Sequence, residues 1–167
     1  MELLKLATEW AKAEVFSTRF FILFALLFLA GSVGFWQLGK TDLAKTYLLT
    51  TLVAGLLLLT IGLGLFFTNK SRVIQFEKSH MENSSSFYKS EIDRTIATLK
   101  EYTVVFKVIP ILIIVFALIL LFVPTPLWRA ISITSIAMLT VIVLIDGMAY
   151  TRMEIYHKEL KLMESKF

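Results

Sequence analysis

Four long apolar stretches separated by polar segments dominate the hydrophobic pattern of the chain. They cover about residues 17–38, 46–68, 102–123 and 127–150, and each has about the 20 residues that a helix needs to cross a bilayer. Inside lipid the backbone must bond to itself, so each stretch is predicted to be an α-helix. The pattern therefore predicts an all-α integral membrane protein, with residues 1–167 forming a single antiparallel bundle of four transmembrane helices.

The polar segments are predicted to extend these helices beyond the membrane. Residues 69–101 are expected to form a helical hairpin whose turn lies in the Asn83-Ser84-Ser85-Ser86 cluster, because Asn and Ser favour helix N-termini. The connections 39–45 and 124–126 are short, which makes the first two and the last two spans antiparallel neighbours.

Basic residues are unevenly distributed around the four spans. All but three of the 17 Lys and Arg residues fall in segments 1–19, 70–107 and 152–166, which share one side of the membrane if the chain crosses four times. Positive charge accumulates on the cytoplasmic side of membrane proteins. The sequence therefore predicts a multi-pass protein with both termini in the cytoplasm, most simply in a bacterial inner membrane.

Composition agrees with this class and narrows the chemistry. The chain is 57% hydrophobic and 18% charged, and it contains no cysteine, which excludes disulfides, thiol nucleophiles and iron–sulfur clusters. The net charge is +4, and the basic residues lie beside the apolar spans. This placement is typical of membrane topology signals, so we expect no nucleic-acid partner. The expected partners are the lipid bilayer and either further copies of the chain or another membrane protein.

Small residues mark surfaces where helices are expected to approach closely. Ala30-x-x-x-Gly34 lies in the first span, and Gly55, Gly62 and Gly64 lie in the second. Residues of this size let helix backbones meet within a membrane. These positions predict tight packing within the bundle or between protomers.

The candidate chemistry begins with the only two histidines, since each follows a glutamate by three residues. The pairs are Glu77 with His80, after the second span, and Glu154 with His157, after the fourth. Side chains three residues apart share a helix face, so each pair could offer a carboxylate and an imidazole to one metal ion. Further carboxylates on the other two helices complete a candidate ligand set: Glu9 or Glu14, and Glu91 or Glu101.

This order of ligands resembles the ferritin-like di-iron carboxylate proteins, by motif layout only. Those proteins take one Glu from each of two helices and a Glu-x-x-His from each of the other two. The resemblance covers these motif residues and not the whole chain, and it departs from that family by placing membrane spans between the ligands. It implies a metal site of iron, manganese or zinc at the cytoplasmic end of the bundle.

Three charged residues form a second candidate site at the cytoplasmic edge of the spans: Arg19, Lys107 and Asp146. An ionisable residue inside a span suggests function. The alternative is structural, with Arg19 and Lys107 extending to the interface and Asp146 paired with one of them.

Three functions follow from these patterns and stay open, so the sequence does not decide whether the chain is an enzyme. The first is a membrane protein with a metal site, for which di-iron redox chemistry on a lipid or quinone is one form. The second is a subunit of an oligomeric ion channel or transporter in which Asp146 lines the path. The third is a non-catalytic scaffold that holds a soluble partner through the hairpin at residues 69–101.

Overall fold

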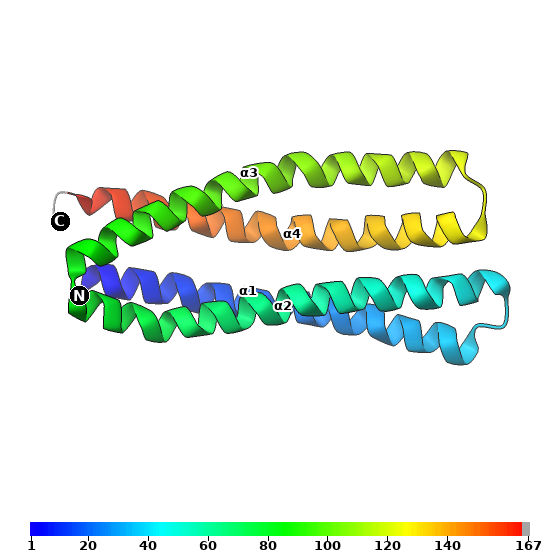
Figure 1. Ribbon diagram of the computed structural model, residues 1–167, viewed down its shortest axis with the longest axis horizontal. Coiled ribbons are helices and arrows are strands. Elements are labelled where there is room, and N and C mark those ends of the chain that lie inside the picture. Colours follow the sequence, from blue (N-terminus) through cyan, green and yellow to red (C-terminus); the bar gives the residue numbers. More distant parts are fainter. Residues whose placement is uncertain (165–167) are drawn as a thin grey trace.

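The computed structural model describes residues 1–164 and consists of four long helices (Figure 1). Helix α1 spans Glu2–Leu38, α2 spans Asp42–Glu82, α3 spans Ser84–Phe122, and α4 spans Pro126–Leu162. The predicted spans lie inside these helices, apart from Val123, which follows the end of α3. The polar segments continue the helices, as expected, and the segment 69–101 turns at Asn83. The all-α, four-helix prediction is confirmed.

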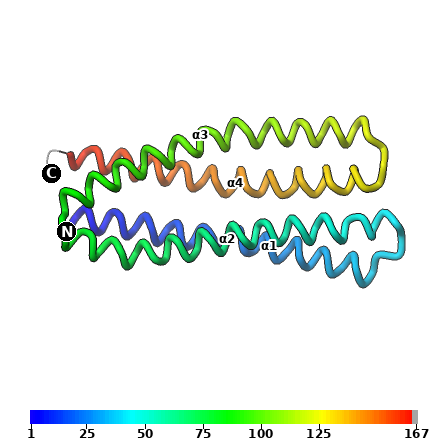
Figure 2. Tube along the Cα trace, viewed as in Figure 1, coloured from blue at the N-terminus to red at the C-terminus, as the bar shows by residue number. Residues whose placement is uncertain are grey.

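The helices form two hairpins that lie along one another, α1 with α2 and α3 with α4 (Figure 2). The start of α1, the end of α4 and the turn between α2 and α3 lie together at what we call the terminal end, and the connections at residues 39–41 and 123–125 form the loop end. The turn at the terminal end is a single residue, Asn83, whose side chain accepts a hydrogen bond from the Ser86 backbone N–H at 2.9 Å. The predicted turn is thus confirmed but shorter, because the serines already belong to α3.

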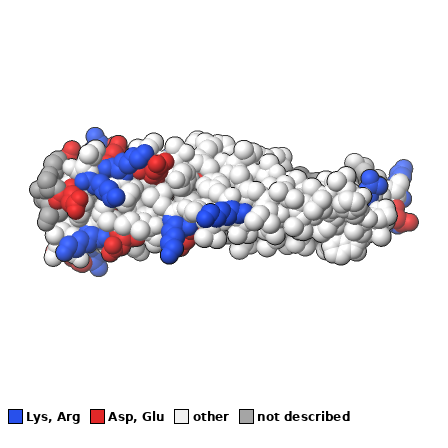
Figure 3. All heavy atoms as spheres, turned by 90° about the horizontal axis from the view of Figure 1, so that it is seen from above, with Lys and Arg blue, Asp and Glu red and all other residues white. Residues whose placement is uncertain are grey.

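A broad apolar band separates the two charged ends of the molecule. On the face shown in Figure 3, Lys, Arg, Asp and Glu gather toward the ends and leave most of the middle uncharged. Each of the four helices is long and apolar enough to cross a membrane. In the most apolar part of α3 only 6% of the residues are buried inside the bundle, so its side chains face outward, as in a helix surrounded by lipid.

Two apolar clusters hold the hairpins together. The first lies at the terminal end, where Leu3, Trp10, Phe76, Phe87 and Tyr156 are among its buried members. The second lies in the apolar band and consists of four buried residues: Phe21, Ala25, Leu58 and Ile145. The terminal end is therefore packed as in a water-soluble bundle, although the chain continues into four apolar spans.

The glycines that the sequence offers for close packing in α1 and α2 divide into two groups. A Cβ atom on Gly55 would lie 2.8 Å from Leu29 Cγ, and one on Gly62 would lie 2.9 Å from Phe21 Cβ, so both glycines permit the close approach of α1 and α2. Gly34 and Gly64 have open space where a Cβ would stand. Close packing within the bundle is confirmed for Gly55 and Gly62, whereas an added Cβ on Gly34 or Gly64 would contact no neighbour within residues 1–164.

Candidate functional site: an amphipathic pocket at the terminal end

Three of the predicted metal ligands lie on the outside of the bundle. Glu9 is exposed and its carboxylate lies 3.9 Å from Lys5 Nζ, and Glu77 is exposed on α2. His80 is half-buried, with its Nδ1 3.2 Å from Ser84 Oγ across the turn. Glu77 and His80 therefore lie apart from the other candidate ligands.

The second pair, Glu154 and His157, lies between α3 and α4. Glu154 accepts from Lys158 Nζ at 2.9 Å. Thr95 Oγ donates to the carbonyl of Ile92, so it accepts its 2.6 Å bond from His157 Nδ1, which carries the proton. Burial, and then the nearby charge of Lys161, lowers the pKa of His157, which keeps the ring neutral at pH 7.

Glu91 is buried at the centre of a cluster that joins three helices. Its carboxylate accepts from Arg94 Nε at 3.0 Å and from the Tyr156 hydroxyl at 2.6 Å, and the Arg94 guanidinium lies 4.1 Å from the centre of the Trp10 ring. Trp10 in turn stacks on Tyr156 with ring centres 5.3 Å apart. We call Trp10, Glu91, Arg94 and Tyr156 the Glu91 cluster.

The protonation states of the Glu91 cluster follow from these contacts. Burial and then the charge of Glu91 raise the pKa of Tyr156, so its hydroxyl stays protonated and donates. Burial alone would lower the pKa of Arg94, but the hydrogen bond and the charge of Glu91 outweigh it, and the net shift is upward. The cluster is thus a fully charged ion pair with a phenol as its third member.

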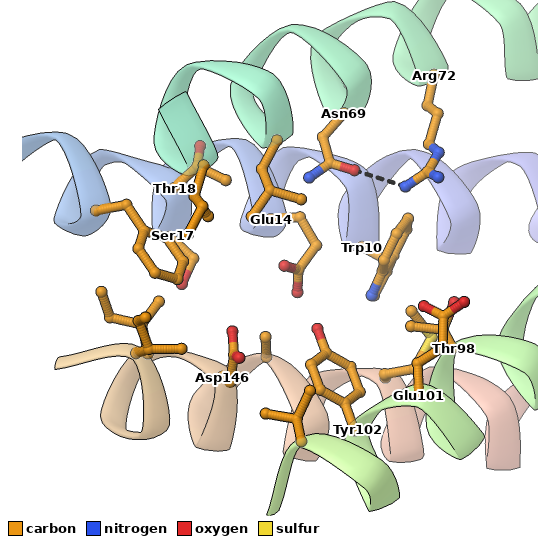
Figure 4. A pocket seen from close by; sticks show the side chains of 18 of the residues that line it. Trp10, Glu14, Ser17, Thr18, Asn69, Arg72, Thr98, Glu101, Tyr102 and Asp146 are labelled. Atoms are coloured by element: carbon orange, nitrogen blue, oxygen red, sulfur yellow. Dashed lines mark hydrogen bonds between the residues drawn. The ribbon is translucent and has the colours of Figure 1, made fainter. Parts of the chain in front are cut away.

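Glu14 is also buried, and it connects α1 with α4. Arg152 Nε donates to its carboxylate at 2.9 Å. Glu14 faces an interior pocket of about 340 Å³ that all four helices line. Figure 4 shows Glu14 and Asp146 pointing into this pocket from opposite sides, with the Tyr102 hydroxyl directed into the same space.

The lining of this pocket changes from polar to apolar along the bundle. Arg72, Arg94 and Trp10 lie toward the terminal end, and Arg72 donates to Asn69 Oδ1 at 2.8 Å. Toward the apolar band the walls are Phe21, Ile61, Leu65, Val105, Ile142 and Ile145. Ile61 and Leu65 are 38% and 40% exposed, and α2 makes few contacts with α3, so the mouth of the pocket opens between these two helices.

Three polar atoms of the residues that line the pocket are buried without a hydrogen-bond partner within residues 1–164. They are the indole nitrogen Nε1 of Trp10, the hydroxyl oxygen of Ser17 and Nη1 of Arg94. Figure 4 shows the Trp10 nitrogen directed into the pocket. Buried donors are nearly always satisfied in folded proteins, so a ligand or water with acceptor oxygens is the natural partner here.

The three charged residues of the second candidate site have different surroundings. Asp146 lines the pocket, Arg19 lies over the Phe16 ring at 5.7 Å, and Lys107 is exposed on the other face of α3. Within residues 1–164 no ion pair joins Asp146 to either cation. The predicted structural pairing of Asp146 is therefore absent, because its side chain turns inward and the two cations turn outward.

Within residues 1–164 the candidate ligands are not brought together into one group. In the part of the chain that the structure describes, no group of three or more His, Cys, Asp or Glu side chains could hold a metal ion. Glu14 and Glu91 already accept from arginines, and Glu101 is exposed at the pocket wall. The convergence of Glu-x-x-His pairs that the sequence suggested is not formed, since the two pairs lie in different surroundings.

The sequence reasoning missed Trp10, Arg94, Tyr102, Arg152 and Tyr156. Only the spacing of Glu91 and Arg94, three residues apart on one helix, was a readable signal of an ion pair. The other partners come from different helices, and no local pattern identifies them.

Comparison with protein-family models, with curated proteins and with solved structures finds no match for this chain.

Proposed function

We propose that this chain is a multi-pass membrane protein that binds an amphiphile in the interior pocket, with the terminal end in the cytoplasm. The observation that carries the proposal is the pocket itself. It combines Trp10 Nε1, a donor without a partner within residues 1–164, toward the terminal end with apolar walls toward the apolar band, and the unpartnered Ser17 hydroxyl lies nearer those walls (Figure 4). A volume of about 340 Å³ lies within the range of small-molecule sites.

The lining indicates the chemistry of the ligand. Trp10 Nε1 and the Ser17 hydroxyl would donate to acceptor oxygens on its head group, and Asp146 would accept from a donor or a cationic group. The apolar body of the ligand would lie against Ile61, Leu65 and residues that face them across the pocket. A lipid-like molecule with a compact, oxygen-rich head group meets both requirements.

A channel formed by one chain is less compatible with this geometry. The polar pocket ends at a cluster of buried apolar side chains that closes it: Phe21, Ala25, Leu58 and Ile145. Beyond it the next polar contact between the hairpins is the 3.1 Å hydrogen bond of Thr50 with Thr134. An ion would have to cross this apolar cluster without polar partners, which is costly.

The ligand can be identified directly. The purified protein, in mild detergent, is extracted with organic solvent, and the extract is analysed by mass spectrometry. We expect one compound class at up to one molecule per chain, reduced at least tenfold in Leu65→Trp, which narrows the mouth of the pocket. Leu63→Trp is the matched control, because Leu63 is 39% exposed on the same helix but does not line the pocket.

A second variant separates binding from folding. Asp146→Leu removes a half-buried carboxylate that has no ion-pair partner within residues 1–164, so it should lower ligand recovery without lowering the melting temperature. Equal recovery from the wild type, Leu65→Trp and Asp146→Leu would refute the pocket as the binding site. The absence of any enriched compound in the wild-type extract would indicate that water alone fills it.

The orientation is testable because the chain has no native cysteine. Single-cysteine variants Ser85→Cys at the terminal end and Thr41→Cys at the loop end are treated in intact cells with a membrane-impermeant maleimide. With the terminal end in the cytoplasm, only Thr41→Cys is labelled before lysis. Labelling of Ser85→Cys alone would reverse the orientation.

A further inference from the structure

A second hollow, distinct from the interior pocket, lies between α3 and α4 on the outside of the bundle. Its volume is about 670 Å³, and it shares no lining residue with the interior pocket. Four lysines line it, and we call it the lysine groove: Lys100 and Lys107 from α3, and Lys158 and Lys161 from α4. Thr103, Val104 and Tyr150 are part of its wall.

The charge of the lysine groove is strongly unbalanced. Glu154 is the acidic side chain among its lining residues, and it pairs with Lys158 in an exposed position. His157 also lines the groove, but its Nδ1 is bonded to Thr95 and its ring is held neutral. Four lysines from two helices therefore face one glutamate, and a bound anion would relieve their mutual repulsion.

The groove lies across the boundary between the polar and apolar parts of the molecule. After Lys107, α3 carries no charged residue up to its end at Phe122, whereas Lys158 and Lys161 lie in the polar last turns of α4. Val104 and Val108, beside Lys107, are 55% and 45% exposed. A ligand seated here would meet ammonium groups on one side and apolar side chains on the other.

We propose that the lysine groove binds the phosphate head group of an anionic phospholipid from the leaflet at the terminal end. Basic pockets between membrane helices on the cytoplasmic side suit such head groups, because the phosphate lies at the depth of the lysines while the acyl chains remain in the bilayer. The exposed apolar surface of α3 next to Lys107 is where the chains would lie. The lysine groove shares no lining residue with the interior pocket, and this proposal does not rest on what that pocket binds.

The strength of binding should follow the number of lysines. Each basic residue near an anionic lipid surface contributes on the order of a fivefold gain in affinity. Removing all four would thus lower the affinity more than tenfold if at least two of them act on one head group. Lysines that only attract the membrane diffusely would contribute equally wherever they lie on the terminal end.

The test compares two variants of the full chain with the same change of charge. The groove variant carries Lys100→Gln, Lys107→Gln, Lys158→Gln and Lys161→Gln. The control variant carries Lys5→Gln, Lys12→Gln, Lys70→Gln and Lys78→Gln, which are all exposed lysines outside the groove. Native mass spectrometry from detergent measures the binding of phosphatidylglycerol and of phosphatidylcholine, and melting temperatures confirm that both variants fold.

We expect the wild type to bind phosphatidylglycerol at least tenfold more tightly than phosphatidylcholine. The groove variant should lose this preference, and the control should keep it within about threefold, since its lysines do not line the groove. Equal losses in both variants, or no preference in the wild type, would overturn the proposal. Soluble glycerol 1-phosphate is the last probe, and if it competed as well as the lipid, the ligand would be a free phosphate compound instead.

Discussion

Removal of the Glu91 carboxylate should destabilise the protein more than any exposed charge change. In Glu91→Leu the guanidinium of Arg94, whose side chain is only 18% exposed, loses its carboxylate, and the Tyr156 hydroxyl loses its acceptor. Arg94 Nη1 is already buried without a partner. Leaving one member of a buried ion pair alone costs about 3–5 kcal/mol. We expect a loss in that range for Glu91→Leu.

The assay is unfolding in mixed detergent micelles, in which increasing sodium dodecyl sulfate is followed by circular dichroism. The wild type, Glu91→Leu, Arg94→Met and the double variant form a mutant cycle. The double variant removes both charges, so it should cost less than the sum of the single variants by about 2 kcal/mol or more. Glu154→Ala is the control, because it breaks an exposed pair with Lys158 that contributes about 0–1 kcal/mol. A Glu91→Leu loss no larger than that of the control, or strictly additive single losses, would refute this account of the cluster.

The remaining predictions concern packing, pH and a bond between the hairpins. Gly62→Ala should lower the free energy of unfolding by about 1–3 kcal/mol because its Cβ would meet Phe21. Gly64→Ala, where the Cβ has open space, should leave the free energy of unfolding unchanged or raise it, and the same unfolding assay distinguishes the two variants. The pKa of His157 is lowered by folding from 6.5, so the unfolded chain takes up a proton first and stability should fall as the pH drops below about 6.5. His157→Gln should show a shallower decline of melting temperature between pH 7 and 5.5, and an unchanged slope would contradict the shift. Thr134→Val removes the hydrogen bond to Thr50 and should cost about 0.5–1 kcal/mol, so a loss above about 2 kcal/mol would indicate a different role.

Most of the fold could be predicted because its strongest determinants are local. Twenty-residue apolar stretches fix the helices, and the short connections around Gly39 and Pro124 fix their pairing into hairpins. Asn83 was readable as a turn because its side chain caps the following helix. The sequence could not predict which small residues face a neighbouring helix. Gly62 and Gly64 are the same residue type two positions apart and differ only in the face of α2 on which they lie.

The candidate site was less predictable because it depends on which face of each helix turns inward. Tyr156 and His157 are adjacent on α4, and the stack of Tyr156 on Trp10 turns the histidine toward Thr95. Glu154 lies in the hollow on the outside of α3 and α4, whereas Glu91 is buried between the helices. The carboxylates that the sequence offered as ligands, Glu14 and Glu91, are instead neutralised by arginines. A buried carboxylate needs a charged partner, and a nearby arginine meets that need without a metal.

Helix α4 contributes residues to the contacts between helices and to both candidate binding sites at the terminal end. Through Arg152 it binds α1, and through Tyr156 it binds α3, so it joins the two hairpins. Its inner face supplies Asp146 to the interior pocket, and its outer face supplies Lys158 to the lysine groove. Because α4 forms a wall of both sites, a shift of this helix would change the shape of both. If ligands at the two sites prefer different positions of α4, each must change the affinity of the other by the same factor, because such coupling is reciprocal.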